Sequence, residues 1–133
     1  MDVPARPHAI LVPFPVQGHI NPMILLSHNL ASHGFIVTFI NSEFNHRRAK
    51  SIHTSSISTV EEDQDTVVAG GAIRFRIIPD GLPEEDTRSN FARLASVTEK
   101  TMGPLLRKVI EEIKEREEHK VTCIIADFFV DPS

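Results

Sequence analysis

The segment from residue 8 to residue 41 is the feature that most restricts the fold. It begins with the apolar run HAILVPF, residues 8–14, which is bounded by turn-forming residues and predicts a buried strand. The run FIVTFIN, residues 35–41, is rich in β-branched and aromatic residues and predicts a second strand. Between them, the apolar residues of PMILLSHNLASH, residues 22–33, recur at helical spacing. A strand, a helix and a strand with short connections predict a βαβ unit and therefore parallel strands.

The ends of this helix carry recognisable signals. Asn21 can cap a helix, and Pro22 suits the first helical position. Gly34 is a suitable residue for ending the helix. The segment PVQGHI, residues 15–20, is therefore expected to be a loop between the first strand and the helix.

The rest of the chain continues the alternation. Residues 54–71 are rich in Ser and Thr, then acidic, then Gly-Gly, and they predict a mobile surface loop. Residues 72–79 predict a third strand. Residues 88–118 predict a helical region that Gly103-Pro104 breaks or kinks. Residues 121–129, VTCIIADFF, predict a fourth buried strand.

Strands that alternate with helices indicate an α/β fold with a Rossmann-like, doubly wound parallel sheet. Right-handed crossovers favour the strand order third, second, first, fourth. His19 follows the first strand, and Asp127 ends the fourth. Because this order makes the two strands neighbours, His19 and Asp127 are expected to lie side by side where such folds bind ligands.

Composition excludes several classes of function. The formal net charge is −4 and no basic face stands out, which argues against nucleic-acid binding. The apolar stretch of residues 9–16 is too short to span a membrane. The single cysteine, Cys123, lies in an apolar run and is expected to be a small buried hydrophobic residue. One cysteine and no export signal favour the cytoplasm.

His19 and Asp127 form a candidate catalytic pair. A neutral imidazole can take a proton from a hydroxyl, and it does so better when a carboxylate holds its other ring N–H. No nucleophile-elbow pattern accompanies the pair, so activation of a substrate nucleophile is favoured over a covalent intermediate. Histidines at strand ends and aspartates in turns are also common as structural residues, and spacing alone leaves that alternative open. No pair of histidines has metal-binding spacing with a carboxylate, so no metal is expected.

A dinucleotide-binding oxidoreductase is the rival interpretation of the same fold. Its Gly-x-Gly-x-x-Gly loop is missing, because only Gly18 follows the first strand. Pro13 and Pro15 also lack the backbone N–H groups that would cradle a pyrophosphate. Glu43 alone resembles the acidic residue that binds a ribose. These features disfavour an oxidoreductase.

Three stretches resemble the plant-type UDP-glycosyltransferases, the family 1 enzymes that transfer sugars to small acceptors. The first is HAILVPFPVQGHINPMILLSHNLASHGFIVTFIN, the second is FRIIPDGLPEED, and the third is VTCIIADFF. The resemblance implies a GT-B fold, of which residues 1–133 would be an incomplete N-terminal, acceptor-side domain. It also implies that the C-terminal domain, which binds the UDP-sugar, lies outside these residues.

The resemblance assigns roles to individual residues. It makes His19 the general base that deprotonates an acceptor hydroxyl, and Asp127 its partner. Gln17 and Gly18 would belong to a loop near acceptor and donor. It implies inversion at the sugar, a small lipophilic acceptor, and UDP-sugar as a co-substrate, with no cofactor and no metal. A truncated, non-catalytic acceptor-binding fragment or pseudoenzyme is the alternative, and the isolated chain is expected to be inactive.

Overall fold

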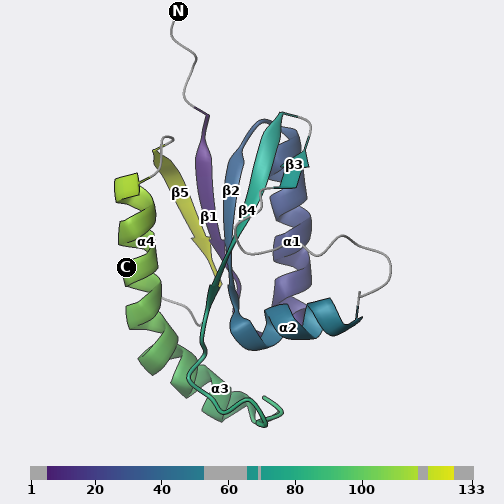
Figure 1. Cartoon of the computed structure of the whole chain (residues 1–133), viewed down its shortest axis with the longest axis vertical. Helices are drawn as coiled ribbons and strands as arrows, with labels where there is room; N and C mark the ends of the chain where they lie inside the picture. Colours follow the sequence, from purple (N-terminus) through teal and green to yellow (C-terminus); the bar gives the residue numbers. More distant parts are fainter. Residues whose placement is uncertain (1–5, 53–65, 69, 117–119, 128–133) are drawn as a thin grey trace, which may run out of the picture.

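In a computed structural model of the chain, five strands of the described residues form one sheet in the order β3-β4-β2-β1-β5 (Figure 1). The structure describes residues 6–52, 66–68, 70–116 and 120–127. The strands are β1 (His8–Val12), β2 (Ile36–Ser42), β3 (Thr66–Val68), β4 (Gly71–Ile78) and β5 (Val121–Ala126). All neighbouring strands run parallel except β3, which is antiparallel to β4.

The helices are α1 (Gln17–Ser32), α2 (Glu43–Ile52), α3 (Phe91–Val97) and α4 (Gly103–Arg116). A π-helical turn, Thr98–Met102, joins α3 to α4. Its Gly103 N–H donates to the carbonyl of Thr98, five residues back, directly before Pro104, which has no N–H. The expected break at Gly103-Pro104 is thus a π turn that ends there, and the helical path continues. Within the described ranges, no helix combines the length and apolar composition needed to cross a membrane.

The predicted α/β fold and strand order are confirmed. The four predicted strands correspond to β1, β2, β4 and β5, and they lie in the order third, second, first, fourth. In register, Ala9 of β1 pairs with Val37 of β2 on one side and with Cys123 of β5 on the other. The first and fourth predicted strands are therefore neighbours.

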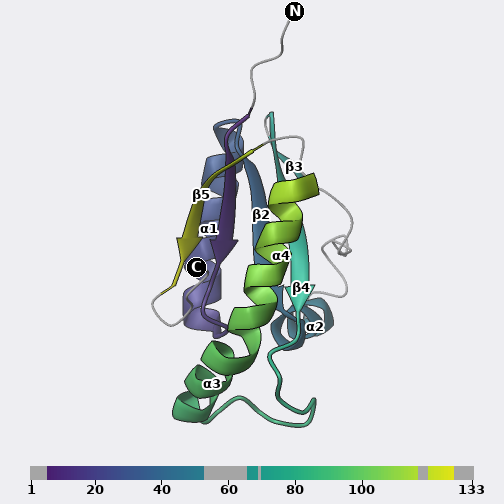
Figure 2. The same ribbon diagram turned by 90° about the vertical axis from the view of Figure 1, so that its left-hand side faces the viewer.

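Two cores cover the two faces of the sheet because side chains alternate along each strand. Ile10 and Val12 face a core that α4 closes with Leu106 and Ile110. The alternate strand positions face a second core, which α1 closes; it includes Ala9, Leu11, Ile20, Met23, Val37 and Phe39. Figure 2 shows α1 and α4 on opposite sides of the strands. This layering leaves the carboxyl edge of the parallel strands open for α2, α3 and the connecting segments.

Two predictions about the strands are wrong in detail. Part of the expected loop at residues 54–71 is the short strand β3, which pairs with the start of β4, whereas residues 53–65 lie outside the described residues. Cys123 is exposed, and β5 is not the buried strand that was expected, because among the described strands it has a neighbour, β1, on one side alone. An apolar sequence predicts a strand, but it does not say what packs against it.

A substitution at Gly71 tests how tightly the start of β4 packs against the end of α1. A Cβ at this position would lie 2.2 Å from the carbonyl oxygen of Ala31 and 2.4 Å from that of Phe35. Both are backbone atoms, so Gly71→Ala should lower the free energy of unfolding by about 1–3 kcal/mol in urea titrations. Gly18→Ala is the control, because Gly18 is exposed and a Cβ there would meet nothing within 4 Å. Equal urea midpoints for the two variants would contradict this packing.

Candidate active site at the carboxyl edge of the sheet

The candidate site lies where β1 and β5 end side by side. Val12 and Ala126, the last residues of the two strands, are register partners. The N–H of Asp127 continues the pairing and donates to the carbonyl of Val12 at 3.1 Å. Because the strands are parallel, the segment after β1 and the residue after β5 emerge at the same edge, at the lower end of Figure 1.

His19 and Asp127 are in contact at this edge. The Nδ1 atom of His19 lies 3.1 Å from Oδ2 of Asp127. The same oxygen accepts the backbone N–H of Phe14 at 3.0 Å. The two side chains are 37% and 23% exposed, so the pair is shielded but open to a substrate. The predicted juxtaposition of these two residues is therefore present.

The proline-rich segment after β1 fixes the surroundings of the pair. Pro13 and Pro15 have no N–H, so Phe14 carries the single backbone donor of residues 13–15, and Asp127 accepts it. The buried ring of Phe14 meets the imidazole of His19 edge-on, with ring centroids 5.6 Å apart. The carbonyl of Pro15 accepts the side-chain amide of Asn45 at 2.9 Å.

Asn45 is a supporting residue that no sequence motif marks. It is 4% exposed, and its side-chain amide also donates to the hydroxyl of Ser42 at 2.9 Å. The fold brings α2 against the proline-rich segment, and only this placement reveals the contact. Asn45 thereby joins the end of β2 to the segment that leads to His19.

The Asp127 contact selects the tautomer of His19. An ionised carboxylate only accepts hydrogen bonds, so the imidazole donates from Nδ1. In the neutral ring, Nε2 is then the acceptor nitrogen. This arrangement can take a proton from a hydroxyl at Nε2 while the carboxylate stabilises the imidazolium that forms.

The start of α1 differs from the prediction. The helix begins at Gln17, with Val16 as its N-cap, and His19 and Ile20 donate their N–H groups to the carbonyl of Val16. Gln17 and Gly18, expected in a loop, therefore lie with His19 in the first helical turn. Pro22 is inside the helix, where it removes the bond that an N–H would make to the carbonyl of residue 18.

The helical position of His19 has an electrostatic consequence. The N-terminal end of a helix disfavours a positive charge nearby, whereas a carboxylate favours one. His19 lies in the first turn of α1 and touches Asp127, so the two influences act on it in opposite directions.

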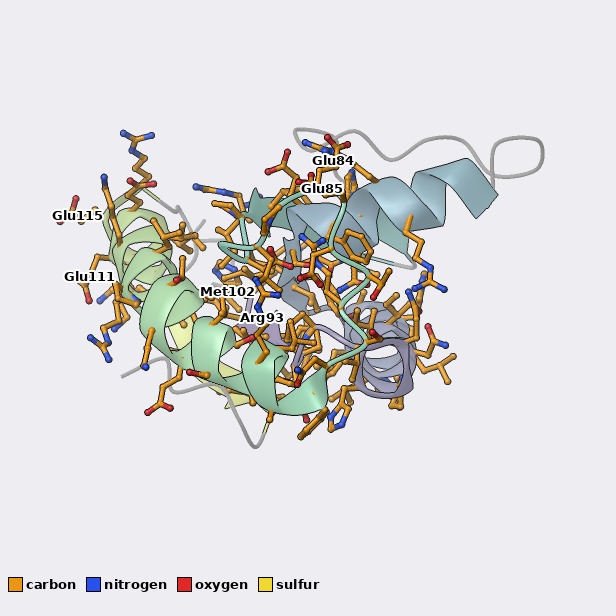
Figure 3. All side chains as sticks on the ribbon, turned by 90° about the horizontal axis from the view of Figure 1, so that it is seen from below. Glu84, Glu85, Arg93, Met102, Glu111 and Glu115 are labelled. Carbon is orange, nitrogen blue, oxygen red and sulfur yellow. The ribbon has the colours of Figure 1, made fainter. Side chains whose placement is uncertain are left out.

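A cavity of about 520 Å³ opens at the same edge, between α2 and the segment that follows β4. Its lining is partly charged and partly apolar, and comprises Glu43, Phe44, Arg47, Arg48, Pro79, Asp80, Leu82, Glu84 and Arg88. Figure 3 looks onto this edge and shows Glu84 and Glu85 beside α2. Among the described residues, no group of three or more His, Cys, Asp or Glu side chains is arranged to hold a metal ion.

The sequence is similar to known glycosyltransferases. Residues 8–64 match the family model described as glycosyltransferase, N-terminal domain. The chain is 39% identical over 127 residues to the (R)-mandelonitrile beta-glucosyltransferase of Prunus dulcis, covering 92% of this chain and 24% of that protein. It is 35% identical over 132 residues to the 7-deoxyloganetin glucosyltransferase of Catharanthus roseus, covering 95% of this chain and 25% of that protein. The chain thus spans about a quarter of the length of these relatives.

Solved structures show the same fold. The Arabidopsis thaliana UGT89C1 complexed with UDP-L-rhamnose superimposes with a TM-score of 0.64 at 16% identity, covering 97% of this chain and 32% of that one. The Phytolacca americana apo UGT2 superimposes with a TM-score of 0.54 at 16% identity, covering 92% of this chain and 25% of that one.

The tautomer of His19 can be measured directly. We expect nitrogen-15 NMR spectra at about pH 8.5, where an ordinary histidine is neutral, to show His19 protonated at Nδ1. In Asp127→Ala this preference should be lost, because the carboxylate that holds the Nδ1 proton is gone. His28, which is exposed on α1, is the internal reference and should not change. The same His19 spectrum in both proteins would show that the contact does not set the tautomer.

Proposed function

Because the chain belongs to the plant-type family 1 UDP-glycosyltransferases, we propose that it supplies the acceptor side and the base of an enzyme that transfers a sugar from a UDP-sugar to a hydroxyl group. The observation that carries this proposal is the contact between His19 and Asp127 at the open carboxyl edge of the sheet. Two glucosyltransferases among the relatives, for (R)-mandelonitrile and 7-deoxyloganetin, support a small hydroxyl-bearing acceptor.

The proposed reaction is a single displacement. Nε2 of His19 takes the proton of the acceptor hydroxyl, and the acceptor oxygen forms a bond to the anomeric carbon of the sugar. The bond from that carbon to UDP breaks, and UDP leaves with the electron pair. Attack from the face opposite to UDP inverts the configuration. Asp127 stabilises the imidazolium, and the site uses neither a metal nor a covalent enzyme intermediate.

We propose that residues 1–133 form the acceptor-side domain of a GT-B enzyme whose donor-binding domain holds the UDP-sugar. The segment after β1 supports this division, because Pro13 and Pro15 offer no N–H and the N–H of Phe14 is bonded to Asp127. Little backbone there can bind a diphosphate. We further propose a cytoplasmic enzyme that binds no nucleic acid, in line with the single cysteine and the net charge of −4.

A chimera tests the activity. Residues 1–133 replace the matching segment of the Prunus dulcis mandelonitrile glucosyltransferase, and UDP-glucose turnover is measured with mandelonitrile and 2-naphthol as acceptors. His19→Ala should lower kcat about 100- to 10,000-fold, because the imidazole proposed to take the acceptor proton is gone. UDP-glucose binding should persist, and His28→Ala should leave kcat unchanged. Near wild-type turnover in His19→Ala would exclude His19 as the base.

Replacing Asp127 is expected to affect kcat less, and the free energy of unfolding more, than replacing His19. In the same chimera, Asp127→Ala should reduce kcat less than His19→Ala, because water can partly orient the imidazole. It should destabilise the protein more, since the N–H of Phe14 loses its acceptor at a cost of about 1–3 kcal/mol. Kinetics and urea unfolding of the two variants measure both effects. The reverse ranking in either measurement would contradict the assigned roles.

A further inference from the structure

Phe91 is a half-exposed aromatic ring close to the candidate base. It is 51% exposed, and within the described part of the chain only Leu25 is a comparably exposed large hydrophobic side chain. Its ring centroid lies 5.4 Å from that of Phe14, in an edge-on arrangement. Phe14 in turn contacts His19. A single buried ring therefore separates an exposed aromatic surface from the imidazole.

The start of α3 holds Phe91 in this place. Asn90 caps the helix, since its side-chain oxygen accepts the N–H of Arg93 at 3.1 Å. Phe91 is the first helical residue, one turn before the buried Leu94. The contact with Phe14 places its ring at the carboxyl edge of the sheet, whereas Leu94 packs in the core.

Arg88 holds the segment that leads into α3 through hydrogen bonds to residues 80–86. Arg88 donates through Nε and Nη2 to the two carboxylate oxygens of Asp80, both at 3.0 Å, and the two side chains are 7% and 4% exposed. Its guanidinium also donates to the carbonyls of Leu82 and Pro83, at 3.3 Å and 2.7 Å, and to that of Asp86. Such a planar, bidentate ion pair is geometrically specific. We refer to this group, Arg88 with Asp80 and the three carbonyls, as the arginine clasp.

Two further features show that the clasp is a defined structure. Arg88 has a φ of 60°, an uncommon conformation for a residue other than glycine, and its N–H donates to the side chain of Asp86 at 2.7 Å. The guanidinium also stacks on the ring of Phe44 of α2, 3.9 Å from the centroid. The clasp therefore anchors residues 80–88 on α2, just before the helix that presents Phe91.

We propose that Phe91 contacts the acceptor and favours acceptors with an aromatic ring, and that Arg88 is the positioning residue that sets Phe91 through the clasp. This inference rests on the proposed transferase function. The exposed part of the Phe91 ring offers an apolar surface that can stack on or meet the edge of a second aromatic ring. An acceptor held there has its hydroxyl-bearing end one ring away from His19. Aliphatic alcohols gain less, because they lack the aromatic contact.

Direct binding of a fluorescent acceptor tests the contact. The chain has no Trp and no Tyr, so the fluorescence of 2-naphthol can be followed without protein background. We expect 2-naphthol to bind the 133-residue chain, and Phe91→Ala to weaken binding about three- to tenfold. Cyclohexanol should compete less well than phenol with the wild-type chain, and Phe91→Leu should reduce this difference. Leu25→Ala is the matched control and should bind as the wild type does.

A double substitution tests the positioning role of Arg88. Arg88→Lys keeps the charge but loses the pair of guanidinium hydrogen bonds to Asp80. It should weaken 2-naphthol binding by a factor similar to that of Phe91→Ala. In the Phe91→Ala background, Arg88→Lys should cause no further loss. Arg76→Lys, which alters the ion pair between β4 and Glu112 of α4, is the control. Circular dichroism confirms that each variant is folded.

The outcomes separate this inference from the proposed function. Equal affinity of wild type and Phe91→Ala for 2-naphthol, or no binding by the folded wild type, would overturn the Phe91 contact. Equal losses for Arg88→Lys with and without Phe91 would overturn the positioning role. If the chimera transfers no sugar while binding still depends on Phe91, the transferase proposal fails and the aromatic site remains.

Discussion

The site depends on one carboxylate oxygen of Asp127, which accepts hydrogen bonds from the backbone N–H of Phe14 and from Nδ1 of His19. It joins the end of β5 to the segment after β1 and to the first turn of α1. The contact exists because β1 and β5 are parallel neighbours, with Val12 and Ala126 in register, so that both chains leave the sheet at the same level. The register of β1 against β5 therefore places Asp127 where it can orient the imidazole of His19.

The prolines beside Phe14 matter to the site because they have no backbone N–H. Pro13 and Pro15 remove two backbone donors, so the N–H of Phe14 is the one that this segment offers, and it is directed to Asp127. A Rossmann-type nucleotide site needs several free N–H groups at the equivalent position after the first strand. In this chain the same position of the fold is organised around a carboxylate and an imidazole. The same topology therefore brings a carboxylate and an imidazole together at the edge where other proteins hold a phosphate.

Strand order and the closeness of His19 and Asp127 could be predicted, because hydrophobic periodicity and right-handed crossovers leave few arrangements. The start of α1 could not be predicted. Its N-cap, Val16, makes no side-chain cap bond, whereas Asn21 and Pro22 imitate a start signal inside the helix. The exposure of Cys123 and the placing of Asn45 depend on which elements meet in space. The arginine clasp is equally hidden, since its acceptors are mostly carbonyls that only the closed segment brings together.

One turn of α2 contacts both the segment that leads to His19 and the segment after β4. Asn45 bonds to Pro15 in the segment that leads to His19, whereas Phe44 and Arg47 contact Arg88 and Glu84 of the segment after β4. Neighbouring residues of α2 thus hold the segment after β1 and the segment after β4, each through different side chains. The buried Asn45 bonds hold the segment that leads to His19, whereas the exposed ion pair of Arg47 with Glu84 contributes little to stability. The segment after β4 is therefore held on α2 mainly by the buried Arg88 and its stack on Phe44, and little by the exposed ion pair.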